Sequence, residues 1–75
     1  MHCLATFETT YMALKFERAG RKSGLDVRII PVPRKLSSSC GFACSFPCES
    51  RTELEAMAAS SKIDVAEYYE MASEH

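Results

Sequence analysis

The sequence predicts an α+β domain of the ferredoxin-like type, a βαββαβ unit with two helices packed on one face of a small antiparallel sheet. Three observations support this class. Two segments, near residues 10–22 and 50–61, carry helix-start signals and apolar residues at helical spacing, and each follows a strand-like run. Another strand-like run comes between them, and a last one would complete the sheet. The 75 residues, 1–75, are expected to form a single domain.

The first strand and the first helix are predicted from the start of the chain. Residues 3–7 are short, apolar and end in an aromatic, which fits a buried strand. Hydroxyl side chains before Tyr11 predict a helix that begins near Thr10 and stops before Gly24. Its apolar face carries Met12, Ala13, Phe16 and Ala19. Its basic residues lie elsewhere on the helix and indicate a solvated face that could attract an acidic partner.

Two further strands are expected between the helices. Residues 25–32 are rich in β-branched side chains, and prolines close the run. In residues 40–48, every second side chain is a cysteine or a phenylalanine, so an extended chain would have one apolar face. That face would carry Cys40, Phe42, Cys44, Phe46 and Cys48.

The sequence predicts the second helix clearly, whereas the pattern of the tail is ambiguous. Residues 50–61 open with two overlapping capping-box patterns, Ser50 with Glu53 and Thr52 with Glu55, and continue in strong helix formers. The buried stripe is expected to contain Leu54, Met57, Ala58 and Ser61. Residues 63–71 fit either a helix or a strand. We favour the strand, with Val65, Tyr69 and Met71 on one side, because it completes a sheet against which both helices can pack.

Composition limits the classes of function. The formal net charge of −1 argues against nucleic acid and against an anionic membrane surface as partners. No apolar run approaches the roughly 20 residues that span a bilayer, and the first residues lack a signal-like pattern, so we expect a cytoplasmic protein. In that compartment four cysteines are expected to be free, redox-active or metal-binding rather than paired in disulfides.

The chain is also short, so its core supplies only a thin margin of stability. Ordering each residue costs on the order of 1.5 kcal/mol of conformational entropy, which a small core barely offsets. A bound ligand or another chain, including a second copy in a homo-oligomer, would add to that margin.

The segment 29–42 is the centre of the functional prediction. Pro31 and Pro33 lack backbone donors, so the chain must leave the sheet near Pro33. A basic pair and three serines then precede Cys40, and Gly41 lets the backbone turn or approach a bound group. Cationic neighbours and oriented N–H groups lower a thiol pKa, so Cys40 is the predicted reactive residue. The predicted binding residues around it are Arg34, Lys35, Ser37, Ser38, Ser39 and Gly41.

These residues resemble a family of small bacterial domains, the selenium/sulfur carrier protein-like family. The resemblance covers roughly residues 3–45, and its central motif is specific. The matching residues are Phe7, Ala13-Leu14-Lys15, Glu17, Pro31-Val32-Pro33-Arg34, Ser37-Ser38-Ser39 and Cys40-Gly41. The resemblance implies a compact α+β fold and a role in holding selenium or sulfur. Cys44 and Cys48 are not part of this motif.

The first hypothesis is therefore a sulfur or selenium carrier. The Cys40 thiolate would take a persulfide sulfur or a selenium atom from a donor protein and pass it to an acceptor protein. The carried atom would be bound covalently to Cys40, and no other cofactor is expected. We expect no stand-alone enzyme activity, because no histidine is placed as a base, no Gly-rich phosphate loop occurs and no paired carboxylates flank the motif.

Two alternatives remain from the sequence. A metal or iron–sulfur site could use Cys40, Cys44 and Cys48, with Cys3 or His2 as a fourth ligand. In a strand, however, Cys40 and Cys48 would be about 26 Å apart, too far to share one ion, and a Cys40–Cys44 disulfide is excluded by the same geometry. The other alternative is a binding or regulatory module in which 31–39 is a docking loop and the cysteines are inert.

Overall fold

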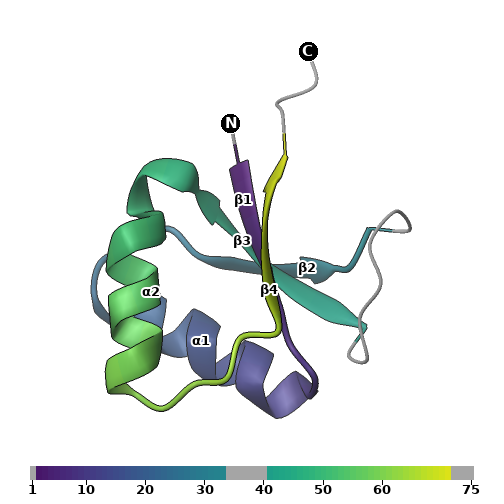
Figure 1. Cartoon of the computed structure of the whole chain (residues 1–75), viewed down its shortest axis with the longest axis horizontal. Helices are drawn as coiled ribbons and strands as arrows, with labels where there is room; N and C mark the ends of the chain where they lie inside the picture. Colours follow the sequence, from purple (N-terminus) through teal and green to yellow (C-terminus); the bar gives the residue numbers. More distant parts are fainter. Residues whose placement is uncertain (1, 34–40, 72–75) are drawn as a thin grey trace.

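The computed structural model describes residues 2–33 and 41–71 and shows the predicted βαββαβ order (Figure 1). A short 3-10 helix, η1, precedes the second α-helix. The elements are β1 (His2–Thr6), α1 (Thr10–Lys22), β2 (Arg28–Pro31), β3 (Phe42–Pro47), η1 (Cys48–Ser50), α2 (Arg51–Ser60) and β4 (Glu67–Met71).

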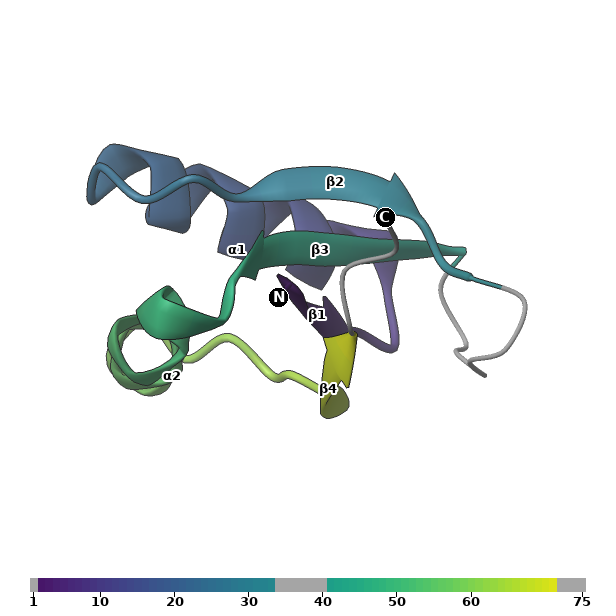
Figure 2. The same cartoon turned by 90° about the horizontal axis from the view of Figure 1, so that it is seen from above.

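The four strands form one antiparallel sheet in the order β2-β3-β1-β4. The strand β1 is central and pairs with β3 on one side and with β4 on the other. Thr6 is paired with Ala43 and with Glu67, so β1 ends where β3 and β4 begin. Figure 2 shows the twist of this sheet, with β2 at one edge and β4 at the other.

The helix α1 begins and ends as the sequence predicts. Thr9 has an extended backbone, and its hydroxyl accepts a hydrogen bond from the Met12 N–H at 3.3 Å, which caps the first turn. After the last turn, Gly24 has φ +84°, a left-handed conformation that glycine adopts without steric cost. An ion pair joins Glu17 and Arg21, one helical turn apart on α1, at 2.6 Å.

The helix α2 forms without the predicted capping boxes. The Ser50 side chain makes no cap hydrogen bond, and its backbone angles (φ −92°, ψ 0°) are not the extended ones of an N-cap. The reason is that η1 runs directly into α2, so the chain reaches Arg51 already coiled. Of the expected buried stripe, Leu54 and Ala58 are buried and Met57 packs against the core, whereas Ser61 is exposed.

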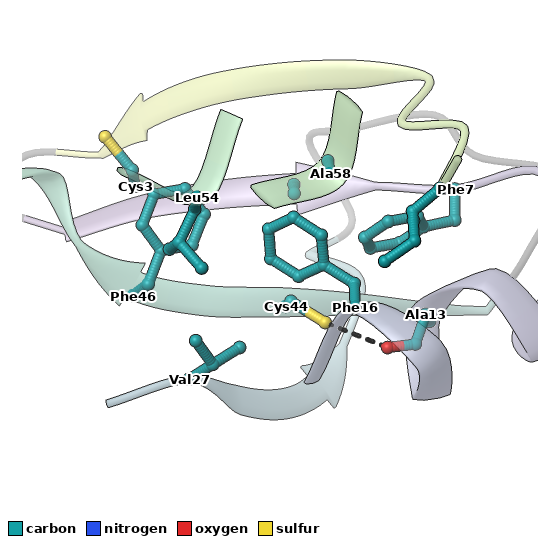
Figure 3. Packing of buried hydrophobic residues seen from close by; sticks show 11 residues of the cluster. Cys3, Phe7, Ala13, Phe16, Val27, Cys44, Phe46, Leu54 and Ala58 are labelled. Carbon is teal, nitrogen blue, oxygen red and sulfur yellow. Dashed lines mark hydrogen bonds between the residues drawn. The ribbon is translucent and has the colours of Figure 1, made fainter. Parts of the chain in front are cut away.

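Both helices cover the same face of the sheet, as predicted, and the core lies between the two layers (Figure 3). On that face β1 contributes Cys3 and Ala5, and β3 contributes Cys44 and Phe46. A row of aromatic rings crosses the core, with centroid distances of 5.3 Å, 6.1 Å and 6.4 Å between successive rings. The rings in this row are Phe7, Phe16, Phe46 and Tyr68.

The tail forms the predicted strand, but its sidedness differs from the prediction. In β4, Tyr68 faces the core and Tyr69 pairs with Leu4 on the other face of the sheet. Val65 precedes the strand and packs against the core instead of sharing a face with Tyr69. Arg51 joins β4 to α2, because its guanidinium lies 2.7 Å from the Glu55 carboxylate, 3.8 Å from that of Glu70 and 5.3 Å from the Tyr68 ring centroid.

No helix within residues 2–33 and 41–71 has the length and apolar character needed to cross a bilayer.

Candidate functional site

Most of the predicted site falls in the segment between β2 and β3. Gly41 is described, whereas the other predicted residues lie outside the described part of the chain: Arg34, Lys35, Ser37, Ser38, Ser39 and Cys40. The site can therefore be placed by its flanking residues, Val32 and Pro33 on one side and Gly41 and Phe42 on the other.

The two flanks meet at the end of the β2–β3 hairpin. The Val32 N–H donates a hydrogen bond to the Gly41 carbonyl at 3.0 Å, and Pro31 is the register partner of Phe42. The hydrogen bond continues the ladder by one step beyond the last strand pair. The chain thus leaves the sheet at Pro33, where the two prolines predicted that it would, and returns at Gly41.

Gly41 is exposed, and the described residues leave space on its side-chain side. A Cβ built on this residue would have no heavy atom of residues 2–33 or 41–71 within 4 Å, and its φ lies outside the left-handed region. The backbone conformation therefore does not require glycine at this position. The space next to Gly41 is compatible with the predicted close approach of a partner or a bound group to the backbone.

The expectation that all four cysteines lack disulfides is wrong for Cys3 and Cys48, which are joined by a disulfide with a Cα–Cα distance of 5.0 Å. The reason is the register of β1 and β3. Phe46 is the partner of Cys3, and Cys48 follows two residues later, where the chain turns into η1. Residues 40–48 are not one long strand, because β3 ends at Pro47.

Cys44 occupies the interior of the domain. It is fully buried between β3 and α1, and its thiol donates a hydrogen bond to the Ala13 carbonyl at 3.3 Å (Figure 3). The inward orientation of Cys44 and Phe46 confirms the alternation predicted for this strand. A buried thiol that is hydrogen-bonded to a helix carbonyl is typical of an inert core cysteine.

The described cysteines do not form a metal centre. Cys48 is bonded to Cys3, and Cys44 is enclosed by the core. Within residues 2–33 and 41–71, no group of three or more histidine, cysteine, aspartate or glutamate side chains comes together in a way that could hold an ion. These positions argue against the hypothesis of a shared site of Cys40, Cys44 and Cys48.

The Cys3–Cys48 pair is the chemical feature that sequence reasoning missed. The signal was available in the predicted fold. Once β1 is placed beside β3 in a ferredoxin-like order, the start of β1, which contains Cys3, lies next to the end of β3, which Cys48 directly follows. Alternation along residues 40–48 places Cys48 on the core face, but alternation within one strand does not show which residue of the neighbouring strand lies beside it.

Fold and cysteine positions together define a class: a small α+β domain with a disulfide at one end of its sheet and a cysteine-containing motif between β2 and β3. The chain belongs to the family described as "Putative Se/S carrier protein-like", whose model matches residues 2–70. The match extends beyond the region of the resemblance seen in the sequence, through α2 and into β4. Neither a curated protein nor a solved structure gave a match.

Proposed function

We propose that this protein is a sulfur or selenium carrier that uses the thiolate of Cys40. The observation that carries the proposal is the position of the other three cysteines. Cys3 and Cys48 are joined to each other, and Cys44 is buried beneath α1. Of the four cysteines, Cys40 is therefore the one left for chemistry with a partner, and it belongs to the specific part of the family motif.

The transfer step needs an accessible thiolate and an anion-stabilising environment. Cys40 as the thiolate attacks the outer sulfur of a donor persulfide, the donor S–S bond breaks, and the donor leaves as a thiolate. Cys40 then carries the persulfide, and attack by an acceptor thiolate on its outer sulfur regenerates the Cys40 thiolate. Arg34 and Lys35 would stabilise the anion, and Ser37, Ser38, Ser39 and the Gly41 N–H would donate hydrogen bonds to it.

The fold suits this role because it presents the motif at one end of a stable sheet. We assign the framework to the ferredoxin-like type, supported by the strand order β2-β3-β1-β4 and by two helices on one face. The Val32–Gly41 hydrogen bond holds the two flanks of the motif together at one end of the sheet. The protein would act with donor and acceptor proteins rather than as an enzyme on its own.

Mass spectrometry after loading tests the proposal. The purified protein is incubated with a cysteine desulfurase and either L-cysteine or L-selenocysteine, and analysed without reductant. We expect a gain of one sulfur or selenium atom that dithiothreitol removes. Peptide mapping should place it on Cys40, and Cys40→Ser should abolish it.

The matched control is Cys44→Ser, which makes the same change at the buried thiol and should still be loaded. Loading of Cys40→Ser to the wild-type level would overturn the proposal. The proposal would also be overturned if the wild-type protein stayed unloaded while the same donor, in a parallel reaction, loaded another thiol-containing protein. Either result would favour the alternative, a binding module with inert cysteines.

A further inference from the structure

The exposed apolar side chains of the domain gather near one end. Among the described residues, the large hydrophobic side chains with the greatest exposure are Tyr11 (66%), Leu14 (51%) and Phe42 (41%). Tyr11 and Leu14 lie on the first half of α1 and, with Lys15 and Arg18, line a surface hollow of about 400 Å³. We call these four residues the α1 patch.

The cations of the α1 patch are available to an anionic partner. Neither Lys15 nor Arg18 forms an ion pair with a described residue, and the Lys15 ammonium lies 5.9 Å from the centroid of the Tyr11 ring. The patch therefore combines two unneutralised positive charges with an aromatic and an aliphatic surface.

A second hollow, larger than that of the α1 patch, differs in its charge balance. It has a volume of about 740 Å³ and lies between α1 and β2. Its charged residues neutralise one another, through an Arg21–Glu17 pair at 2.6 Å and an Arg28–Asp26 pair at 3.6 Å. Of these two hollows, the α1 patch is the one with a net charge to be matched by a partner.

The patch also lies at the end of the sheet that carries the motif. Ala13, between the two exposed apolar residues of α1, receives the hydrogen bond of Cys44, which is two residues from Phe42. In Figures 1 and 2, α1 starts from the side of the sheet where β2 ends and β3 begins. The first turns of α1 are therefore at the same end of the sheet as the Val32–Gly41 base of the motif.

From this combination we propose that the α1 patch docks the protein that donates sulfur or selenium to Cys40, through a segment in which an apolar side chain is flanked by carboxylates. The inference rests on the proposed function and adds the recognition surface and the chemistry of the partner. Carboxylates match Lys15 and Arg18, and an apolar side chain matches the exposed surfaces of Tyr11 and Leu14. The overall net charge of −1 does not favour nucleic acid as the occupant.

A comparison of two sulfur donors distinguishes an effect on docking from an effect on the reactivity of Cys40. A cysteine desulfurase with L-cysteine must dock, whereas glutathione persulfide reaches the thiol without a protein interface. We expect Lys15→Glu/Arg18→Glu to slow the loading of Cys40 by the desulfurase about tenfold or more, with a weaker dependence on salt than the wild type shows. Loading by glutathione persulfide should change less than twofold. Tyr11→Ser/Leu14→Ser should also slow the desulfurase reaction selectively.

The controls reverse a positive charge, or offer an amine, elsewhere on the domain. Arg28 lies on β2 at the end away from Pro31. Arg28→Glu should therefore change the rate of Cys40 loading only slightly, and by the same factor with both donors. Zero-length carbodiimide cross-linking, which joins an amine to a carboxylate, should connect Lys15 to the desulfurase more efficiently than Lys22 or Lys62.

The possible failures are distinguishable. If neither donor loads Cys40, the carrier function itself fails. If both donors load every variant at the wild-type rate, the docking surface is overturned while the carrier function stands. Cross-links at Lys22 and Lys62 as strong as those at Lys15 would overturn it too. The docking surface would also be overturned if analytical ultracentrifugation showed that the wild-type protein self-associates and that the patch variants are monomers. The occupant of the α1 patch would then be a second copy of the chain.

Discussion

Gly20 on α1 packs so closely against Val27 that a Cβ on Gly20 would lie 2.6 Å from Val27 Cγ2. Leu54 of α2 closes the same space, with Cδ2 at 3.2 Å from that Cβ position. Val27 is fully buried and its β-branched side chain is stiff, so it has little freedom to move away. The absence of a side chain at Gly20 thus sets the distance between α1 and the chain that enters β2.

Gly20→Ala should therefore destabilise the domain. Overpacking costs about 1–3 kcal/mol, and the gain of roughly 1 kcal/mol from better helix propensity offsets only part of it. Denaturant unfolding would measure the net loss. Gly41→Ala is the matched control, because its added Cβ meets no atom of the described part of the chain within 4 Å, and its unfolding free energy should stay near the wild-type value. Equal stability of both variants would contradict the packing argument.

Reduction of the Cys3–Cys48 disulfide should lower the free energy of unfolding. The bond closes a loop with a sequence separation of 45 residues, for which the chain-entropy estimate is about 4 kcal/mol. Urea unfolding with and without dithiothreitol would measure the difference. The double variant Cys3→Ala/Cys48→Ala should be less stable than the oxidised protein and insensitive to the reductant. An oxidised wild type that unfolds at the same urea concentration as its reduced form would refute this expectation.

Cys44 should resist alkylation as long as the domain stays folded. The side chain is fully buried and its thiol is hydrogen-bonded to the Ala13 carbonyl, so iodoacetamide should reach it only when the domain opens. Cys40 should be labelled far sooner, including below neutral pH. Peptide mapping of a labelling time course would separate the two. Labelling of Cys44 as fast as Cys40 in native conditions would mean that the β3–α1 contact opens readily.

Tyr68 should lose its proton later than an ordinary tyrosine. Burial raises its pKa above 10.0, the Glu55 carboxylate raises it further, and the nearby Arg51 guanidinium acts in the opposite direction. The fold therefore binds this proton more tightly than the unfolded chain does. That contribution to stability is fully present below pH 10.0 and is lost as the pH rises through the pKa of the folded state.

Alkaline titration monitored by tyrosinate absorbance would test this order. The last ionisation step should disappear in Tyr68→Phe, whereas Tyr69→Phe should retain it. Arg51→Gln should move the step to higher pH, because the opposing positive charge is removed. A step that moves to lower pH in Arg51→Gln would contradict the assignment.

The sequence predicted those elements whose signals are local. Thr9 and Gly24 bound α1 because a hydroxyl cap and a left-handed glycine act within a few residues. Alternation along β3 placed Cys44 and Phe46 in the core for the same reason. The strand β4 was predicted only because it completes the sheet, since its local pattern also fitted a helix.

Features that depend on neighbouring segments escaped the prediction. The cap at Ser50 failed because η1 delivers a coiled chain to α2. The disulfide depends on the register between β1 and β3, which no local pattern specifies. In the candidate site, the prolines predicted where the chain leaves the sheet. The return point at Gly41 depends on a hydrogen bond across the hairpin to Val32, and no local sequence pattern specifies which residues pair there. The reactive role of Cys40 stays a prediction.

The hydrogen bond between Val32 and Gly41 also makes the domain a candidate host for foreign peptides. Because this hydrogen bond joins the two ends of the motif, a segment of a different length could be grafted between Val32 and Gly41 while the four-stranded sheet stays intact. Doubling the length of such an insert would cost only about 0.6 kcal/mol of closure entropy. A library of grafted sequences on this platform would form a minimal display scaffold.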